Sequence, residues 1–118
     1  MEERIFFVKR STKSIKNIEV KSINGLITDF ARFNKIKILL RSVRTAIDFE
    51  YEEKLANLNK KIAKEIETVF LFSSYEFSFI SSSSVKEIAY HGGDISKFIP
   101  SSIRGKLIKI IYKKIRSV

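Results

Sequence analysis

The chain has 118 residues, enough for one domain, and contains no cysteine and a single histidine, His91. These counts exclude disulfide scaffolds, thiolate metal sites, cysteine nucleophiles and a metal centre built from several histidines of one chain. The formal net charge of +10 favours an anionic partner, but residues 104–116 carry six basic side chains and no acidic one. No apolar run approaches the roughly 20 residues of a membrane span, and the charged start does not resemble a secretory signal. We therefore expect no membrane partner and a cytoplasmic location.

Helix and strand patterns alternate along the first half of the chain. Residues 2–13 are weakly helical, residues 17–23 alternate apolar and basic side chains as a strand does, and residues 26–33 have helical spacing. The aliphatic run 36–40 predicts a buried parallel strand. A helix follows it, with Asp48 as a possible N-cap.

The second half continues the alternation. Residues 67–72 predict another apolar strand, and the serine run 81–84 precedes a helix that ends at two glycines. Residues 103–118 predict a last helix with apolar side chains on one side and basic ones on the other. This order indicates an α/β fold, with a parallel sheet flanked by helices. In such folds ligands bind at the carboxyl ends of the strands.

Two arginines follow the first aliphatic strand. Arg41 and Arg44 could each hold phosphate oxygens, because a guanidinium group forms paired hydrogen bonds with phosphate. Ion pairing with nearby carboxylates is the alternative, and on spacing alone it is the favoured one. The candidate partners are Asp48, Glu50 and Glu52.

The four serines at 81–84 stand where a helix begins after the second strand. A helix N-terminus offers unpaired backbone N–H groups and a partial positive charge, which suit an anion. Plain N-capping by one serine is the alternative. The pattern leaves both interpretations open.

Three motifs of the second half resemble those of phosphopantetheine adenylyltransferases. The family signature runs E-T-V-F-L, S-F-I-S-S-S-x-V-K-E and G-G-D-x-S-x-F-x-P, and here ETVFL stands at 67–71, SFISSSSVKE at 78–87 and GGDISKFIP at 92–100. RSVRTAIDFEYE at 41–52 is similar to the family's R-G-x-R-A-x-x-D-F-E-Y-E. The resemblance covers the chain up to about Ile103.

The resemblance implies a Rossmann-like nucleotidyltransferase fold. It also implies transfer of AMP from ATP to 4′-phosphopantetheine in coenzyme A biosynthesis, with Mg²⁺ assisting and with a hexameric assembly. By position, Arg41 would bind the phosphate of phosphopantetheine, and Ile27 and Asn59 would lie along its pantetheine arm. The positions carried over to ATP are Ser42, Val43, Arg44, Glu52, Phe77, Ser78, Phe79, Ile80, Ser81, Ser82 and Ser83.

The chain departs from the family at its start. No opening strands and no T-x-G-H loop are found, so no catalytic residue is assigned. We expect a single partial nucleotidyltransferase domain over 1–118, the C-terminal two-thirds of the family's fold, with a basic helix at about 103–118. His91 does not replace the missing histidine, because its position beside two glycines is typical of a helix end. A further departure is Ser42, where the family has glycine.

Two other functions are compatible with the sequence. A binding module could keep the phosphate-binding loops without performing chemistry. A nucleic-acid binder could use the basic tail, but the sequence has no recognition motif and no stacking platform for bases, so we expect no nucleic-acid partner.

Overall fold

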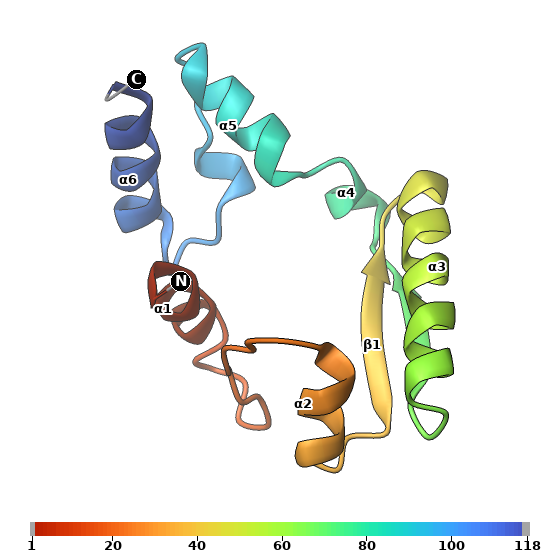
Figure 1. Cartoon of the computed structure of the whole chain (residues 1–118). Helices are drawn as coiled ribbons and strands as arrows, with labels where there is room; N and C mark the ends of the chain where they lie inside the picture. The colour runs from red at the N-terminus through yellow and green to blue at the C-terminus, as the bar shows by residue number, and fades with distance from the viewer. Residues whose placement is uncertain (1, 117–118) are drawn as a thin grey trace. The chain divides into compact units, whose positions relative to one another are not determined.

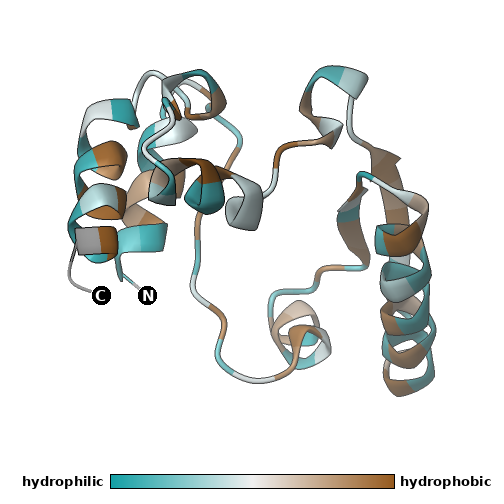
Figure 2. Ribbon diagram, turned by 90° about the horizontal axis from the view of Figure 1, so that it is seen from above, coloured by the Kyte–Doolittle hydropathy of each residue, from teal (hydrophilic) through white to brown (hydrophobic). Residues whose placement is uncertain are grey.

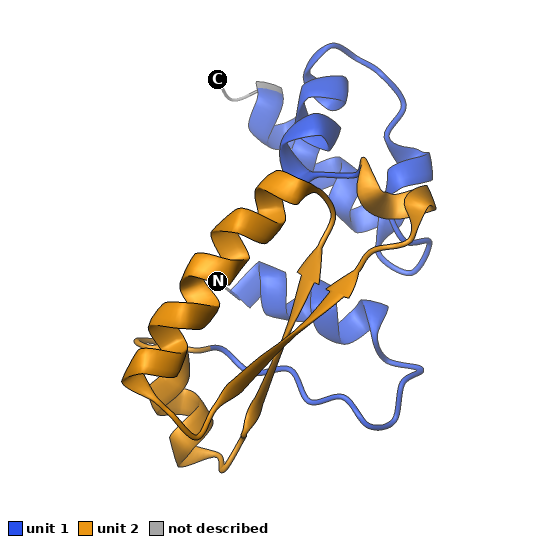
Figure 3. Cartoon of the chain, turned by 90° about the vertical axis from the view of Figure 1, so that its right-hand side faces the viewer, with its two compact units in different colours: residues 1–22, 80–118 blue, residues 23–79 orange. Residues whose placement is uncertain are grey.

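The structure is a computed structural model that describes residues 2–116. The chain forms two compact units (Figure 3). Unit 1 combines the described parts of Met1–Ser22 and Ile80–Val118, and unit 2 is Ile23–Phe79. In the described part of the chain, no helix combines the length and the apolar character that crossing a membrane requires.

Unit 2 is built on a two-stranded parallel sheet. Strand β1 (Ile38–Val43) pairs with β2 (Glu67–Phe72) in one continuous register, from Ile38 opposite Glu67 to Val43 opposite Phe72. Helix α3 (Ala46–Ile62) connects the two strands and lies along the sheet (Figures 1 and 3). Parallel neighbours need such a crossover, so β1, α3 and β2 form a βαβ unit. This arrangement confirms the α/β fold with a parallel sheet and flanking helices.

The two faces of this sheet have different surroundings. On the α3 side, Phe49 packs edge-to-face against Phe70, with ring centroids 5.4 Å apart. Arg41 lies opposite Phe70 in the register, so its side chain is on the same side of the sheet. Side chains alternate along a strand, so Val43, two residues after Arg41, shares that side, and it is fully buried. The opposite side carries four apolar side chains that are 42–61% exposed: Ile38, Leu40, Val69 and Leu71.

Helix α2 (Ile27–Phe33) belongs to the core of unit 2. Its Ala31 is buried in a cluster with Ala63 and Ile66, against which Leu39 packs. The helix ends in a Schellman motif, in which the N–H of Ile36 bonds the carbonyl of Ala31 at 2.8 Å. The residue in left-handed conformation is Lys35, with φ 57°. Unit 2 ends with the short helix α4 (Tyr75–Ser78).

Unit 1 is helical. Its elements are α1 (Glu2–Ser11), α5 (Ser82–Tyr90), the 3-10 turn η1 (Ser96–Phe98) and α6 (Arg104–Arg116). The core of the unit is Ala89, Ile95, Ile99 and Ile103. Apolar side chains of α6, among them Leu107 and Ile111, pack against this core. Both apolar and polar residues occur along α3 and α6 (Figure 2), as in amphipathic helices.

Three expectations about local structure are wrong. Residues 17–23 form no strand; Ile18 is 46% exposed, and the described residues offer this segment no neighbouring strand to pair with. The first strand is 38–43 rather than 36–40, because the ladder with β2 continues through Arg41 and Ser42. The N-cap of α3 is therefore Thr45, whose hydroxyl accepts a hydrogen bond from the Asp48 N–H at 3.2 Å.

Candidate functional site

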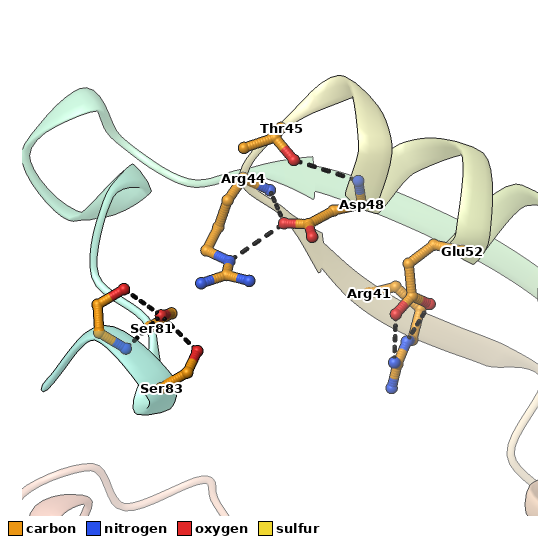
Figure 4. Close-up of polar contacts among 8 residues, drawn as sticks. Arg41, Arg44, Thr45, Asp48, Glu52, Ser81 and Ser83 are labelled. Atoms are coloured by element: carbon orange, nitrogen blue, oxygen red, sulfur yellow. Dashed lines mark hydrogen bonds and ion pairs between the residues drawn. The ribbon is translucent and has the colours of Figure 1, made fainter. Parts of the chain in front are cut away.

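An ion pair joins β1 to α3 in unit 2. Arg41 donates from Nε to Oε2 of Glu52 at 2.7 Å and from Nη2 to Oε1 at 2.6 Å (Figure 4). The Glu52 side chain is only 12% exposed, whereas that of Arg41 is 51% exposed. The hydrogen bonds from Arg41, supported by its charge, hold the pKa of the Glu52 carboxyl below its usual value, although burial opposes them. The same hydrogen bonds raise the pKa of Arg41.

A second ion pair lies one helical turn earlier on α3. Arg44 Nε donates to Asp48 Oδ2 at 3.1 Å, and the Arg44 backbone N–H approaches the same oxygen at 3.3 Å (Figure 4). Asp48 and Glu52 are four residues apart and therefore lie on one side of the helix. The ion-pairing alternative for the two arginines is thus confirmed for Asp48 and Glu52. Glu50, the third candidate partner, is exposed on the helix.

A cavity of about 370 Å³ brings together the three residues assigned to phosphopantetheine. Ile27 comes from α2, Arg41 from β1 and Asn59 from α3. The remaining lining is mostly apolar and includes Leu39, Leu55 and Ala56. The cavity therefore combines an apolar wall with the amide of Asn59 and the ion pair of Arg41 with Glu52. This composition suits a ligand with a phosphate at one end and an uncharged arm.

A second cavity of about 400 Å³ lies at the start of α3. It is lined by Ser42 and Arg44, which were assigned to ATP, and by Asp48, Tyr51 and Glu52. Val43, also assigned to ATP, is fully buried and contributes no lining. Ser42 stands on the extended backbone of β1. Its replacement of the family's glycine therefore demands no left-handed conformation.

The remaining ATP positions are divided between the two units. Phe77 and Phe79 are 60% and 64% exposed at α4 and its C-cap, and the Ser78 hydroxyl donates to the Tyr75 carbonyl at 3.0 Å. Ile80 and the serine run belong to unit 1.

The serine run begins α5. Ser81 is its N-cap, and its hydroxyl accepts from the Ser84 N–H at 3.0 Å (Figure 4). The capping interpretation is therefore confirmed for Ser81, and Ser82 and Ser83 occupy the exposed first turn. Ile80, Ser81 and Ser82 also line a cavity of about 640 Å³ within unit 1, together with Arg4 and Lys86.

Several lining residues were not singled out from the sequence. In the first cavity, Leu55 and Ala56 follow Glu52 by three and four residues, and Asn59 follows it by seven. This spacing places Leu55 and Ala56 on the same side of a helix as Glu52 and the already assigned Asn59, and it could have identified them. Tyr51 in the second cavity follows Asp48 by three residues and has the same signal. Arg4 in unit 1 has no comparable signal, because only the folded chain places it beside the assigned serines.

Metal-binding groups are sparse in the described residues. Between residues 2 and 116, no three acidic or histidine side chains gather closely enough to hold a metal ion. Asp48 and Glu52 are each paired with an arginine. His91 is the exposed C-cap residue of α5, with its ring edge-on to Tyr90 at 5.3 Å.

Comparison with known proteins identifies the family. The profile of the cytidylyltransferase-like family matches residues 1–88. A phosphopantetheine adenylyltransferase of Clostridium botulinum (strain Eklund 17B / Type B) is 46% identical over 109 residues, which cover 92% of this chain and 69% of the relative. One of Lachnoclostridium phytofermentans is 47% identical over 114 residues, covering 97% and 68%. The chain belongs to the phosphopantetheine adenylyltransferase family. This membership confirms the family and the nucleotidyltransferase fold predicted from the motifs.

Proposed function

We propose that the protein transfers the AMP moiety of ATP to 4′-phosphopantetheine in coenzyme A biosynthesis. A phosphate oxygen of phosphopantetheine attacks the α-phosphorus of ATP, forming a new P–O bond. The bond from the α-phosphorus to its bridging oxygen breaks, and the products are dephospho-coenzyme A and pyrophosphate. The observation that carries the proposal is the cavity that brings Ile27, Arg41 and Asn59 together from three separate elements.

The first cavity suits phosphopantetheine. Its arm is largely uncharged and contains amides, which match the apolar wall at Leu39 and Leu55 and the side-chain amide of Asn59. Its phosphate is an anion that the Arg41 guanidinium can bind through two parallel hydrogen bonds. Ile27 closes the wall from α2.

The second cavity suits the polyphosphate of ATP. Arg44 supplies a permanent positive charge there, and the Ser42 hydroxyl can donate a hydrogen bond to a phosphate oxygen. By the resemblance to the family, the positions from Phe77 to Ser83 are also proposed as contacts of ATP. Phe77 and Phe79 offer exposed aromatic rings in unit 2, and Ser81 caps the N-terminus of α5 in unit 1.

The contribution of these residues to catalysis is positioning and charge stabilisation. Holding the two substrates in line makes a bimolecular reaction effectively unimolecular. Fixed cationic groups stabilise negative charge as it develops on the transferred phosphoryl group. Mg²⁺ is proposed to enter as the counter-ion of ATP, because the described residues offer no set of metal ligands of their own. No residue of this chain is assigned as its ligand.

The proposed partners are the two substrates and further copies of the chain in a hexamer, a state that rests on the resemblance to the family. We propose neither a nucleic-acid nor a membrane partner. The apolar side of α6 is used in packing the core of unit 1. Some of its basic residues are engaged within the same unit: Lys106 lies 3.9 Å from the centre of the Phe6 ring, and Lys114 lies 3.6 Å from Glu3. A reaction that consumes ATP would take place in the cytoplasm, where we propose that the protein resides.

A second candidate function is binding of the same ligands without chemistry. It is favoured by one observation: among the described residues, no histidine lines either cavity of unit 2, and His91 caps the end of α5. Both candidates require that the chain bind ATP and phosphopantetheine.

Titration calorimetry of the full chain with each ligand tests this common requirement. Saturable binding of both ligands is expected, and absence of binding for both would refute the two candidates together. Release of pyrophosphate from ATP, with and without phosphopantetheine, then separates them. Release that depends on phosphopantetheine supports the enzyme, and binding without release supports the second candidate.

A further inference from the structure

Glu52 borders both cavities of unit 2. It lines the first cavity together with Arg41 and Asn59, and it lines the second together with Ser42 and Arg44. It is the one residue that the linings of these two cavities share. The resemblance to the family places Glu52 on the ATP side, whereas its hydrogen bonds go to the arginine assigned to phosphopantetheine.

The geometry of the ion pair leaves one edge of Arg41 for a ligand. A guanidinium group has five N–H donors. Glu52 accepts from the Nε hydrogen and from one hydrogen on Nη2. The two hydrogens of Nη1 and the second hydrogen of Nη2 therefore lie outside this ion pair. One hydrogen of Nη1 and the second hydrogen of Nη2 form the edge at the end of the guanidinium group, which can bind two phosphate oxygens side by side.

We propose that Glu52 is a positioning residue for the phosphate of 4′-phosphopantetheine and acts through Arg41. The inference rests on the proposed function and extends it. The carboxylate fixes the Nε edge of the guanidinium group, so that the Nη1 and Nη2 edge is presented to the cavity before the ligand arrives. Preorganisation of this kind strengthens binding because the ligand does not bear the entropic cost of ordering the arginine.

Competition between Glu52 and the phosphate is the alternative, and the geometry disfavours it. The carboxylate and a bound phosphate would use different edges of the guanidinium group. Glu52 is 12% exposed and belongs to a helix, whereas the Arg41 side chain is 51% exposed and has several rotatable bonds. Without Glu52, Arg41 would therefore lose its fixed orientation. The lowered pKa of Glu52 keeps the carboxylate ionised at neutral pH.

Calorimetry of the full chain with 4′-phosphopantetheine and with pantetheine, which lacks the phosphate, tests the inference. We expect Glu52→Gln to weaken phosphopantetheine binding about tenfold, equivalent to about 1.4 kcal/mol, and to leave pantetheine binding unchanged. Glu53→Gln is the matched control, because it removes the same charge from an exposed position of α3 that lines neither cavity. This control should bind both ligands as the unmodified chain does.

A double-mutant cycle distinguishes positioning from general damage. If Glu52 acts through Arg41, Glu52→Gln should have no further effect on phosphopantetheine binding in a chain that already carries Arg41→Ala. Equal or tighter phosphopantetheine binding by Glu52→Gln would overturn the inference, and so would equal weakening of both ligands. Failure of the unmodified chain to bind phosphopantetheine would instead overturn the proposed function.

Discussion

Arg41 on β1 and Glu52 on α3 are joined by two hydrogen bonds, of 2.7 and 2.6 Å. The rotation of α3 against the strand brings the Glu52 carboxylate to the Arg41 guanidinium group. Because Asp48, Glu52 and Asn59 share one side of α3, this rotation directs all three toward the two cavities. The ion pair is thus part of the structure and part of the candidate site.

Acid should destabilise the folded chain partly through Glu52. The pKa of this carboxyl is lowered from its ordinary value of 4.5 in the folded chain. Between the folded pKa and 4.5, unfolded Glu52 holds more protons than folded Glu52, so stability is present above this window and is lost as pH falls through it. Glu52→Gln should therefore be less stable at neutral pH, by less than about 1 kcal/mol because Arg41 is half exposed.

Urea unfolding between pH 7 and pH 3 checks this prediction. Glu65 and Asp94 also have lowered pKa values, so the variant should keep part of the acid sensitivity of the unmodified chain. Superimposable pH profiles for the two chains would contradict the prediction.

Two valines of the sheet should respond differently to truncation. Val43 is fully buried and Val69 is 42% exposed. Val43→Ala should lower the free energy of unfolding by about 2 kcal/mol, because it removes buried methyl groups and leaves a cavity. Val69→Ala, the matched control on the other strand, should cost less than about 1 kcal/mol. Urea unfolding measures both, and equal losses would show that the two faces of the sheet are not distinguished as described.

Lys35→Gly and Gly92→Ala should change the stability of the chain in opposite directions. Both residues follow a helix end in left-handed conformation, with φ of 57° and 77°. Lys35→Gly relieves an unfavourable conformation and should stabilise the chain by up to about 1 kcal/mol. Gly92→Ala introduces an unfavourable conformation and should destabilise the chain by about 1 kcal/mol. Thermal unfolding checks the pair, and a change of the same sign in both variants would contradict the assignment.

Substitution of Arg41 and of Arg44 should each weaken the binding of a different ligand. Arg41→Gln should weaken 4′-phosphopantetheine binding, and Arg44→Gln should weaken ATP binding. Each loss should be about 1.5–3 kcal/mol, the range for a hydrogen bond to a charged group, or roughly ten- to a hundredfold. Each variant is the control for the other, since both remove one arginine paired with α3. Calorimetry with both ligands measures the pattern, and a uniform loss of both would contradict separate subsites.

The sequence predicts well the features that depend on neighbouring residues. Strand 67–72 and the Ser81 cap are recognisable because an apolar run and a cap followed by its helix are local signals. The segment 17–23 has a strand-like alternation but forms no strand, since a strand also needs a partner. Thr45 was missed as the N-cap because β1 continues through polar Arg41 and Ser42, held by the ladder with β2.

In the candidate site, too, the sequence predicts which residues take part but not how folding brings them together. The motifs singled out Arg41, Glu52 and Asn59, but not that they surround one cavity. The spacing suggested that Arg41 and Arg44 pair with carboxylates, but not which partner each takes. Such choices depend on the rotation of α3 against the sheet, which is a property of the packed unit.

Formation of dephospho-coenzyme A is the most direct test of the account. The full chain is incubated with ATP, Mg²⁺ and 4′-phosphopantetheine, and the products are identified by mass spectrometry, with each substrate omitted in turn. We predict dephospho-coenzyme A and pyrophosphate in equal amounts, only when both substrates are present. Binding of both substrates without formation of dephospho-coenzyme A would contradict the proposed transfer reaction.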